Sequence, residues 1–184
     1  MLVRHAEPAL DAAACAALYA PFVSGGFASL EEAPPTDGEM ASRIERISTR
    51  YPWLVAGTGR EVLGFAYASQ HRERASYRWV VDVTAYVAPA HQRRGVGRAL
   101  YGALMPLIAR QGLHVACAGI TLPNDASVAL HESFGFRPVG VYRRIGWKAG
   151  AWRDVGWWEL QLVSPSSDGA QPAEPGPPVR IGGG

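Results

Sequence analysis

A strand-like run, a short loop with two glycines and a helical segment follow one another between residues 79 and 109, and this succession most constrains the fold. Residues 79–87 (WVVDVTAYV) are rich in β-branched and aromatic residues, which favours a strand that ends before Pro89. After the loop 92–97 (QRRGVG), aliphatic residues recur at helical spacing: Val96, Leu100, Leu104 and Leu107. A strand that leads into a helix in this way is typical of a mixed α/β domain.

The flanking segments extend this pattern. Helical spacing or a capping residue predicts further helices over 11–23, 37–51 and 125–134. Thr36 or Asp37 can cap the second of these. Apolar runs between turn residues predict strands over 53–56, 61–68, 113–121 and within 137–162. Pro106 predicts a kink or an early end in the helix that follows the loop 92–97. We therefore expect one mixed α/β domain over residues 1–163, followed by a disordered tail rich in proline, glycine and serine over 164–184.

Composition excludes several classes of protein. The formal net charge of +2 gives no electrostatic footprint for nucleic acid or an anionic membrane. Apolar runs are far shorter than the roughly 20 residues that a membrane helix needs. Cys15 and Cys117 lie in apolar segments without metal-ligand spacing, which predicts reduced thiols in a cytoplasmic protein that holds no metal.

The loop 92–97 has the features of a phosphate-binding turn. Unpaired backbone N–H groups and the positive end of the helix dipole meet where a helix begins. Gly95 and Gly97 carry no Cβ and would let a diphosphate approach the backbone, while Arg93 and Arg94 add positive charge. The Walker and Rossmann patterns both lack their required residues here. For these six residues alone, a glycine-bearing helix start without any ligand is an equal alternative.

In its context, the loop resembles the acetyl-CoA signature of GNAT N-acetyltransferases, Gln/Arg-x-x-Gly-x-Gly/Ala. More closely, the chain resembles the phosphinothricin N-acetyltransferases in four blocks, which read RYPWLVA (50–56), YVAPAHQR (86–93), LPNDASV (122–128, with His131 and Glu132) and GAWRDVGWW (150–158). The resemblance covers about residues 50–162, and the first forty residues match poorly.

This resemblance implies a GNAT fold with a mostly antiparallel central sheet flanked by helices, acetyl-CoA as co-substrate and a homodimer. It implies that the following residues bind the cofactor: Ala85, Tyr86, Val87, Gln92, Arg93, Arg94, Gly95, Val96, Gly97, Arg98, Asn124 and Ser127. Asn124 and Ser127 are equally at home as plain helix caps. The tryptophans of the last strands, Trp147, Trp152, Trp157 and Trp158, are expected in the core and at a subunit interface.

Asp82 is the first candidate for catalysis. Amide formation needs a neutral amine, so a group must take the proton of the ammonium ion. Strand alternation places Asp82, Thr84 and Tyr86 on one face, next to apolar walls that would raise the pKa of the carboxyl group. The resembling enzymes usually have glutamate at this position, so the shorter Asp82 favours a relay through water. A structural Asp82 that pairs with backbone groups or an arginine is the alternative.

His131 is the second candidate. Asn124, Ser127 and His131 are spaced by three and four residues and share one face of the predicted helix. Many GNAT enzymes have a tyrosine near the thioester sulfur at this position, whereas the phosphinothricin subfamily resembles this chain in having histidine. A neutral imidazole could take the amine proton, and an imidazolium could stabilise the thiolate. A structural histidine is the alternative.

The acceptor implied by the resemblance is the α-amine of a small amino acid with an anionic or oxidised side group, such as phosphinothricin or methionine sulfoximine or sulfone. The residues that would contact it are Leu30, Arg72, Arg74, Tyr77, Thr84 and Val155. Leu30 stands where the family has a packing phenylalanine, and the charged loop residues could equally be solvated. Another small amine, a drug or a protein N-terminus is an alternative acceptor. A non-catalytic acetyl-CoA-binding regulatory domain is an alternative of another class.

Overall fold

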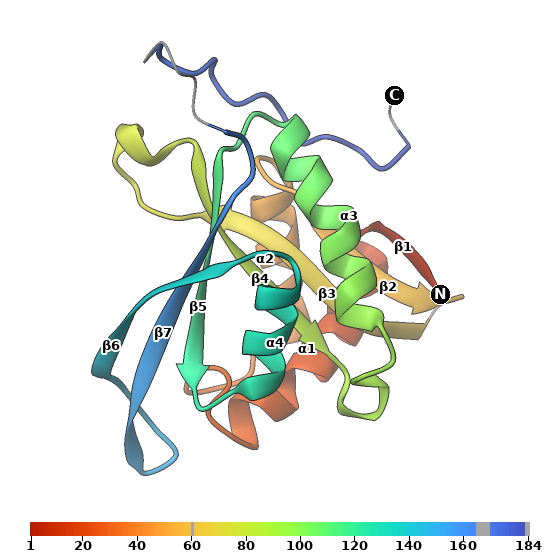
Figure 1. The fold of residues 1–184 in the computed structure, drawn as a ribbon. Helices are drawn as coiled ribbons and strands as arrows, with labels where there is room; N and C mark the ends of the chain where they lie inside the picture. Colours follow the sequence, from red (N-terminus) through yellow and green to blue (C-terminus); the bar gives the residue numbers. More distant parts are fainter. Residues whose placement is uncertain (60, 165–169, 183–184) are drawn as a thin grey trace.

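The computed structural model describes residues 1–59, 61–164 and 170–182 (Figure 1). Within these ranges the strands form one seven-stranded sheet in the order β1-β2-β3-β4-β5-β7-β6. The strands are β1 (Leu2–His5), β2 (Trp53–Thr58), β3 (Glu61–Gln70), β4 (Val80–Val87), β5 (Val115–Leu122), β6 (Arg137–Lys148) and β7 (Ala151–Gln161). All neighbours are antiparallel except β4 and β5, so the expected mixed α/β fold with a mostly antiparallel sheet is confirmed.

Four α-helices flank the sheet in the described part of the chain: α1 (Pro8–Ser24), α2 (Asp37–Ser48), α3 (Val96–Arg110) and α4 (Asp125–Ser133). Thr36 caps α2 in a capping box with Glu39, and Asn124 caps α4 by accepting a hydrogen bond from the Ser127 N–H. Helix α3 continues through Pro106 to Arg110 and does not end early. Strand β1 was not expected from the sequence.

The two faces of the sheet carry separate apolar cores. Along β2, Trp53 and Val55 point to the core under α1 and α2, whereas Leu54 and Ala56 point to the core under α3. This alternation follows from the two-residue period of a strand. It fixes the face on which each side chain of β4 lies, because Val81 and Val83 pack in the α3 core while Tyr86 packs against the α1 and α2 core.

The parallel pair β4 and β5 opens like a fork. Only three residue pairs join these strands, from Val80 with Val115 to Asp82 with Cys117. Beyond Asp82 the two strands separate, and α4 follows β5 beside the opening (Figure 1). The closed end of the fork therefore lies at Asp82 and Cys117, and its open end faces the start of α3.

The described part of the tail, residues 170–182, contains no helix or strand but contacts the domain. Trp79 Nε1 donates to the carbonyl oxygen of Ala173, and Arg78 pairs with Glu174 at 2.8 Å. Gly176 exchanges two hydrogen bonds with Gln111, the residue after α3 (Figure 1). Part of the expected disordered tail, residues 165–169 and 183–184, lies outside the described residues. The described helices include none with the length and apolar character to cross a membrane.

Candidate acetyl-transfer site

A cleft of about 830 Å³ occupies the fork between β4 and β5. Its walls come from β4 beyond Asp82, from Gly119, Ile120 and Thr121 of β5, and from α3 and α4. Every residue expected to bind the cofactor lines this cleft except Arg94. The sequence reasoning missed the β5 wall, since the fork depends on how two strands pair and not on a local motif.

The loop before α3 has the backbone geometry of an anion site. Arg93 and Gly95 both have left-handed backbone conformations, with φ of 57° and 81°. The first helical hydrogen bond runs from the Ala99 N–H to the Gly95 carbonyl oxygen at 2.9 Å. The N–H groups of Val96, Gly97 and Arg98 therefore precede the helical pattern and are available to a ligand in the cleft that these residues line.

His131 lines the cleft, but both of its ring nitrogens have partners inside the protein. Nδ1 lies 2.7 Å from the Ser127 carbonyl oxygen, which can only accept, so Nδ1 carries the hydrogen. Nε2 then accepts from the Tyr101 hydroxyl at 2.9 Å. The residue is 5% exposed, and Tyr101 is fully buried.

Burial lowers the pKa of His131, and its hydrogen bond to Ser127 opposes this only in part. The imidazole is therefore neutral near pH 7. To accept a proton it would have to give up the Tyr101 hydroxyl. The geometry supports a neutral ring that shapes the cleft better than it supports an imidazolium beside the thiolate.

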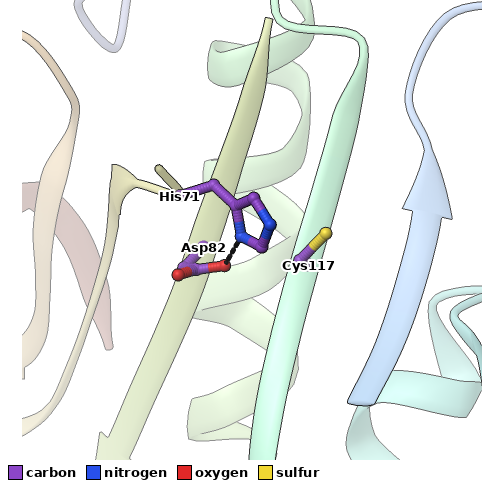
Figure 2. A group of neighbouring side chains, drawn as sticks. All are labelled: His71, Asp82 and Cys117. Atoms are coloured by element: carbon purple, nitrogen blue, oxygen red, sulfur yellow. Dashed lines mark hydrogen bonds and ion pairs between the residues drawn. The ribbon is translucent and has the colours of Figure 1, made fainter. Parts of the chain in front are cut away.

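Asp82 lies at the closed end of the fork and does not line the cleft itself. Its Oδ1 atom is 2.6 Å from Nδ1 of His71 (Figure 2). Burial raises the pKa of the Asp82 carboxyl group, although the hydrogen bond from His71 and its charge oppose the rise. His71 was not predicted from the sequence as a site residue. The two-residue spacing of Tyr67, Ser69 and His71, which continues the alternation of β3 one residue past its end, was the signal that could have found it.

Two of the expected acceptor contacts gather around His71. The Tyr77 ring meets the His71 ring edge-on at 5.9 Å, and the Arg72 guanidinium lies 6.0 Å from the centre of the Trp157 ring. Trp157 in turn meets His71 edge-on at 6.0 Å. Arg74 is exposed at the start of the short helix Ala75–Tyr77 and is not part of this cluster.

The remaining expected contacts lie on other walls. Thr84 lines the cleft and pairs with Tyr67 across the sheet, and Val155 pairs with Thr121 on β5. Leu30 packs closely against Gly146 of β6. A Cβ atom added at Gly146 would lie 2.8 and 3.2 Å from the two Cδ atoms of Leu30. The Lys148 ammonium group also donates to the Glu31 carbonyl oxygen. The loop between α1 and α2 is thus held against the β6–β7 hairpin.

Comparisons with known proteins agree with this geometry. The model of the acetyltransferase (GNAT) family matches residues 13–136. A phosphinothricin N-acetyltransferase of Streptomyces viridochromogenes is 39% identical over 158 residues, 86% of each chain. An L-methionine sulfoximine/L-methionine sulfone acetyltransferase of Salmonella typhimurium is 38% identical over 127 residues, 69% of this chain and 74% of the relative. The solved structure of a GNAT superfamily phosphinothricin acetyltransferase from Sinorhizobium meliloti with acetyl-CoA superposes with a TM-score of 0.87 at 33% identity, covering 94% of this chain and 93% of that one.

Proposed function

The chain belongs to the acetyltransferase (GNAT) family, and we propose that it transfers acetyl from acetyl-CoA to the α-amine of a small amino acid such as phosphinothricin, methionine sulfoximine or methionine sulfone. The observation that carries this proposal is the fork cleft, which has free N–H groups of a helix start at one end and lies next to a carboxylate with a histidine and aromatic neighbours at the other. The two ends provide for the two substrates that an acetyl transfer brings together.

The cofactor half of the site follows from the α3 start. The diphosphate of acetyl-CoA would lie on the N–H groups of Val96, Gly97 and Arg98, with Arg93 and Arg94 adding charge-assisted contacts. The pantetheine arm would then run along β4 from Val87 toward Val83, which line the cleft. This direction brings the thioester to the closed end of the fork, next to Asp82. Asn124 and Ser127 would contact the arm from the α4 side.

The acceptor half follows from the cluster around Asp82. Arg72 and Tyr77 would bind the anionic or oxidised side group of the acceptor, and Asp82 would draw its ammonium group toward the thioester. Arg74, Thr84, Val155 and Leu30 stay predicted contacts at the edge of this space. His131 stays a predicted catalytic residue, on the condition that its ring gives up the Tyr101 hydroxyl.

A thiol-release assay with acetyl-CoA tests this function. We expect turnover with phosphinothricin, methionine sulfoximine and methionine sulfone. Methionine is the matched control, because it lacks only the oxidised side group and should react more slowly. Arg72→Ala should reduce the difference in turnover between methionine sulfone and methionine. The reason is that it removes a charge-assisted hydrogen bond to the oxidised side group, which contributes about 1.5–3 kcal/mol.

Other results of this assay point to the alternatives. Faster turnover with unrelated amines or with a protein N-terminus would indicate that the acceptor is one of these and not a small amino acid. Tight acetyl-CoA binding without turnover on any amine would favour a non-catalytic regulatory domain.

Two wider expectations belong to the same proposal. Acetylation would remove the charge of the acceptor amine, and we expect the enzyme to protect a cell against phosphinothricin in this way. A growth assay with cells that express the gene tests this expectation. A cytoplasmic location is supported by the free thiols of Cys15 and Cys117 and is open to test by cell fractionation.

A further inference from the structure

We propose that His71 takes the proton of the acceptor amine and that Asp82 is the positioning residue that holds its ring. This inference rests on the proposed acetyl transfer and assigns the base within that site. It starts from the 2.6 Å hydrogen bond between His71 Nδ1 and Asp82 Oδ1 (Figure 2). His71 directly follows the end of β3 at Gln70, and Ser69, two residues before it, pairs with Asp82 of β4.

The hydrogen bond fixes the tautomer of the neutral ring. An ionised carboxylate can only accept, so Nδ1 of His71 carries the hydrogen and Nε2 holds the free lone pair. Nε2 has no hydrogen-bond partner among the described residues. The arrangement therefore presents an unoccupied basic nitrogen, in contrast to His131, whose two nitrogens are both engaged.

The ring is held from several sides. The His71 side chain is 14% exposed, and the rings of Tyr77 and Trp157 meet it edge-on at 5.9 and 6.0 Å. A ring in such a frame loses little further freedom when a substrate binds, which favours proton transfer in a fixed geometry.

The dyad lies at the closed end of the fork, next to the cleft, where the proposed acetyl transfer would bring the amine. Asp82 and Cys117 are the last pair of β4 and β5, and the cleft lining begins at Val83 on β4 and at Gly119 on β5. A ring nitrogen of His71, a carboxylate oxygen of Asp82 and Cys117 Sγ all lie within 4.8 Å of one another (Figure 2). Burial raises the pKa of the Cys117 thiol to about 11, so the thiol stays neutral and does not compete for the proton.

Asp82 alone is a less suitable base. The Oδ1 atom is already occupied by His71, and the side chain is one methylene shorter than the glutamate of the resembling enzymes. The His71 ring lies beyond the carboxylate and edge-on to Tyr77, a predicted acceptor contact, so it would supply the missing reach. The carboxylate then stabilises the imidazolium that forms, as a buried acid does behind a catalytic histidine.

The proton and electron pairs balance in this scheme. The ammonium group of the acceptor gives one proton to Nε2 of His71, and the free amine attacks the thioester carbonyl carbon. The C–N bond forms and the C–S bond breaks, with its electron pair leaving on sulfur. The second amine proton neutralises the thiolate, so the products are the N-acetyl amino acid and the CoA thiol. The proton on His71 passes to solvent.

The test compares His71→Asn with Asp82→Asn in the full-length enzyme. The asparagine amide in His71→Asn can still donate to Asp82 but offers no basic nitrogen in place of Nε2. We expect kcat to fall on the order of 10²–10⁴-fold, as for loss of a general base, while calorimetric acetyl-CoA affinity is unchanged. Asp82→Asn should lower kcat by a similar factor, and the kcat of the double variant should be no lower than that of either single variant. His114→Ala, a histidine outside the cluster, should keep the wild-type rate.

A second readout separates a base from a structural role. Imidazole added to His71→Ala should restore part of the rate, because it can occupy the vacated space, and should not accelerate Asp82→Asn. Near wild-type kcat in His71→Asn would overturn the inference and leave Asp82 as the base. Loss of acetyl-CoA affinity in step with kcat would overturn it in favour of a structural role. If the wild type turns over none of the amines, the proposed function fails and the inference fails with it.

Discussion

Gly97 is the second residue of α3 and lies next to Leu130 of α4. An added Cβ would lie 3.1 Å from Leu130 Cδ2 and 3.7 Å from Val87 Cγ2, two side chains that line the cleft. We expect Gly97→Val to abolish acetyl-CoA binding measured by titration calorimetry, because the branched side chain fills the space that the diphosphate needs near the N–H groups. The overpacking should also cost about 1–3 kcal/mol of stability.

Gly102→Ala is the matched control on the same helix. An added Cβ at Gly102 meets nothing within 4 Å. It should leave acetyl-CoA affinity unchanged and stabilise α3 by up to about 1 kcal/mol, since glycine is a poor helix former. Normal acetyl-CoA binding in folded Gly97→Val would contradict the assignment of this loop as the diphosphate site.

At the scale of single residues, the sequence predicted what depends on local periodicity. The shared face of Asp82, Thr84 and Tyr86 is confirmed, because alternation along a strand is a property of that strand alone. The partner of Asp82 was not predicted, since it depends on the register of β3 against β4. The contact between His131 and Tyr101 joins residues thirty positions apart through the packing of α3 and α4, and no motif in either helix reports it.

At the scale of elements, the short edge strand β1 illustrates the same limit. Its four residues are half-buried or exposed and show no clear alternation. What holds β1 is pairing with β2 and two 2.7 Å hydrogen bonds from the Arg4 guanidinium to Asp11 of α1. Burial alone would raise the pKa of Asp11, but the bonds from Arg4 and from the Glu7 N–H outweigh it and lower the pKa. The strand β2 and Asp11 of α1 lie outside the four residues of β1, so the sequence of β1 alone could not predict that it forms a strand.

The tail is the element whose expected behaviour is most open to test. Removal of residues 165–184 would take away the acceptor of Trp79 Nε1, the carboxylate that pairs with Arg78 and the hydrogen bonds between Gln111 and Gly176. Because these contacts would be lost, we expect the thermal midpoint of the truncated chain to fall by about 2–4 °C per kcal/mol lost, the usual response of a domain of this size. Differential scanning calorimetry measures this shift.

Glu174→Ala in the full-length chain serves as the control for the truncation. Its carboxylate is 63% exposed, so its pairing with Arg78 should contribute less than about 1 kcal/mol. An unchanged midpoint in the truncated chain would instead support the disordered tail that the composition of 164–184 predicts.

At the scale of the whole molecule, the β6–β7 hairpin stands apart from the two cores. Strand β6 is the edge of the sheet and is exposed along nearly all of its length. Large apolar side chains remain exposed on this hairpin: Val139, Val141, Tyr142, Ile145, Trp147 and Trp152. The sequence predicted both a core and an interface role for its tryptophans, and the structure separates them, with Trp158 buried and Trp147 and Trp152 exposed.

We propose that a second copy of the chain covers this hairpin. An apolar group on an unpaired sheet edge is unfavourable in water and favours association. Trp147 and Trp152 pack edge-on at 5.5 Å and are 60% and 57% exposed, so they form a preformed apolar surface. We expect the wild type to sediment as a dimer and Ile145→Glu/Trp147→Glu to sediment as a monomer, because each dimer would bury both added carboxylates twice.

Leu10→Glu is the control for the dimer prediction, because Leu10 is 69% exposed near the start of α1, which follows β1 at the sheet edge opposite β6. It should leave the sedimentation coefficient of the wild type unchanged. Gly146 and Lys148 of the hairpin contact Leu30 and Glu31 of the α1–α2 loop. Dimerisation would therefore restrict the motion of this loop, which carries the predicted acceptor contact Leu30. The monomeric variant should therefore lose affinity for the acceptor and keep that for acetyl-CoA. A wild type that sediments as a monomer at all concentrations would contradict the proposal.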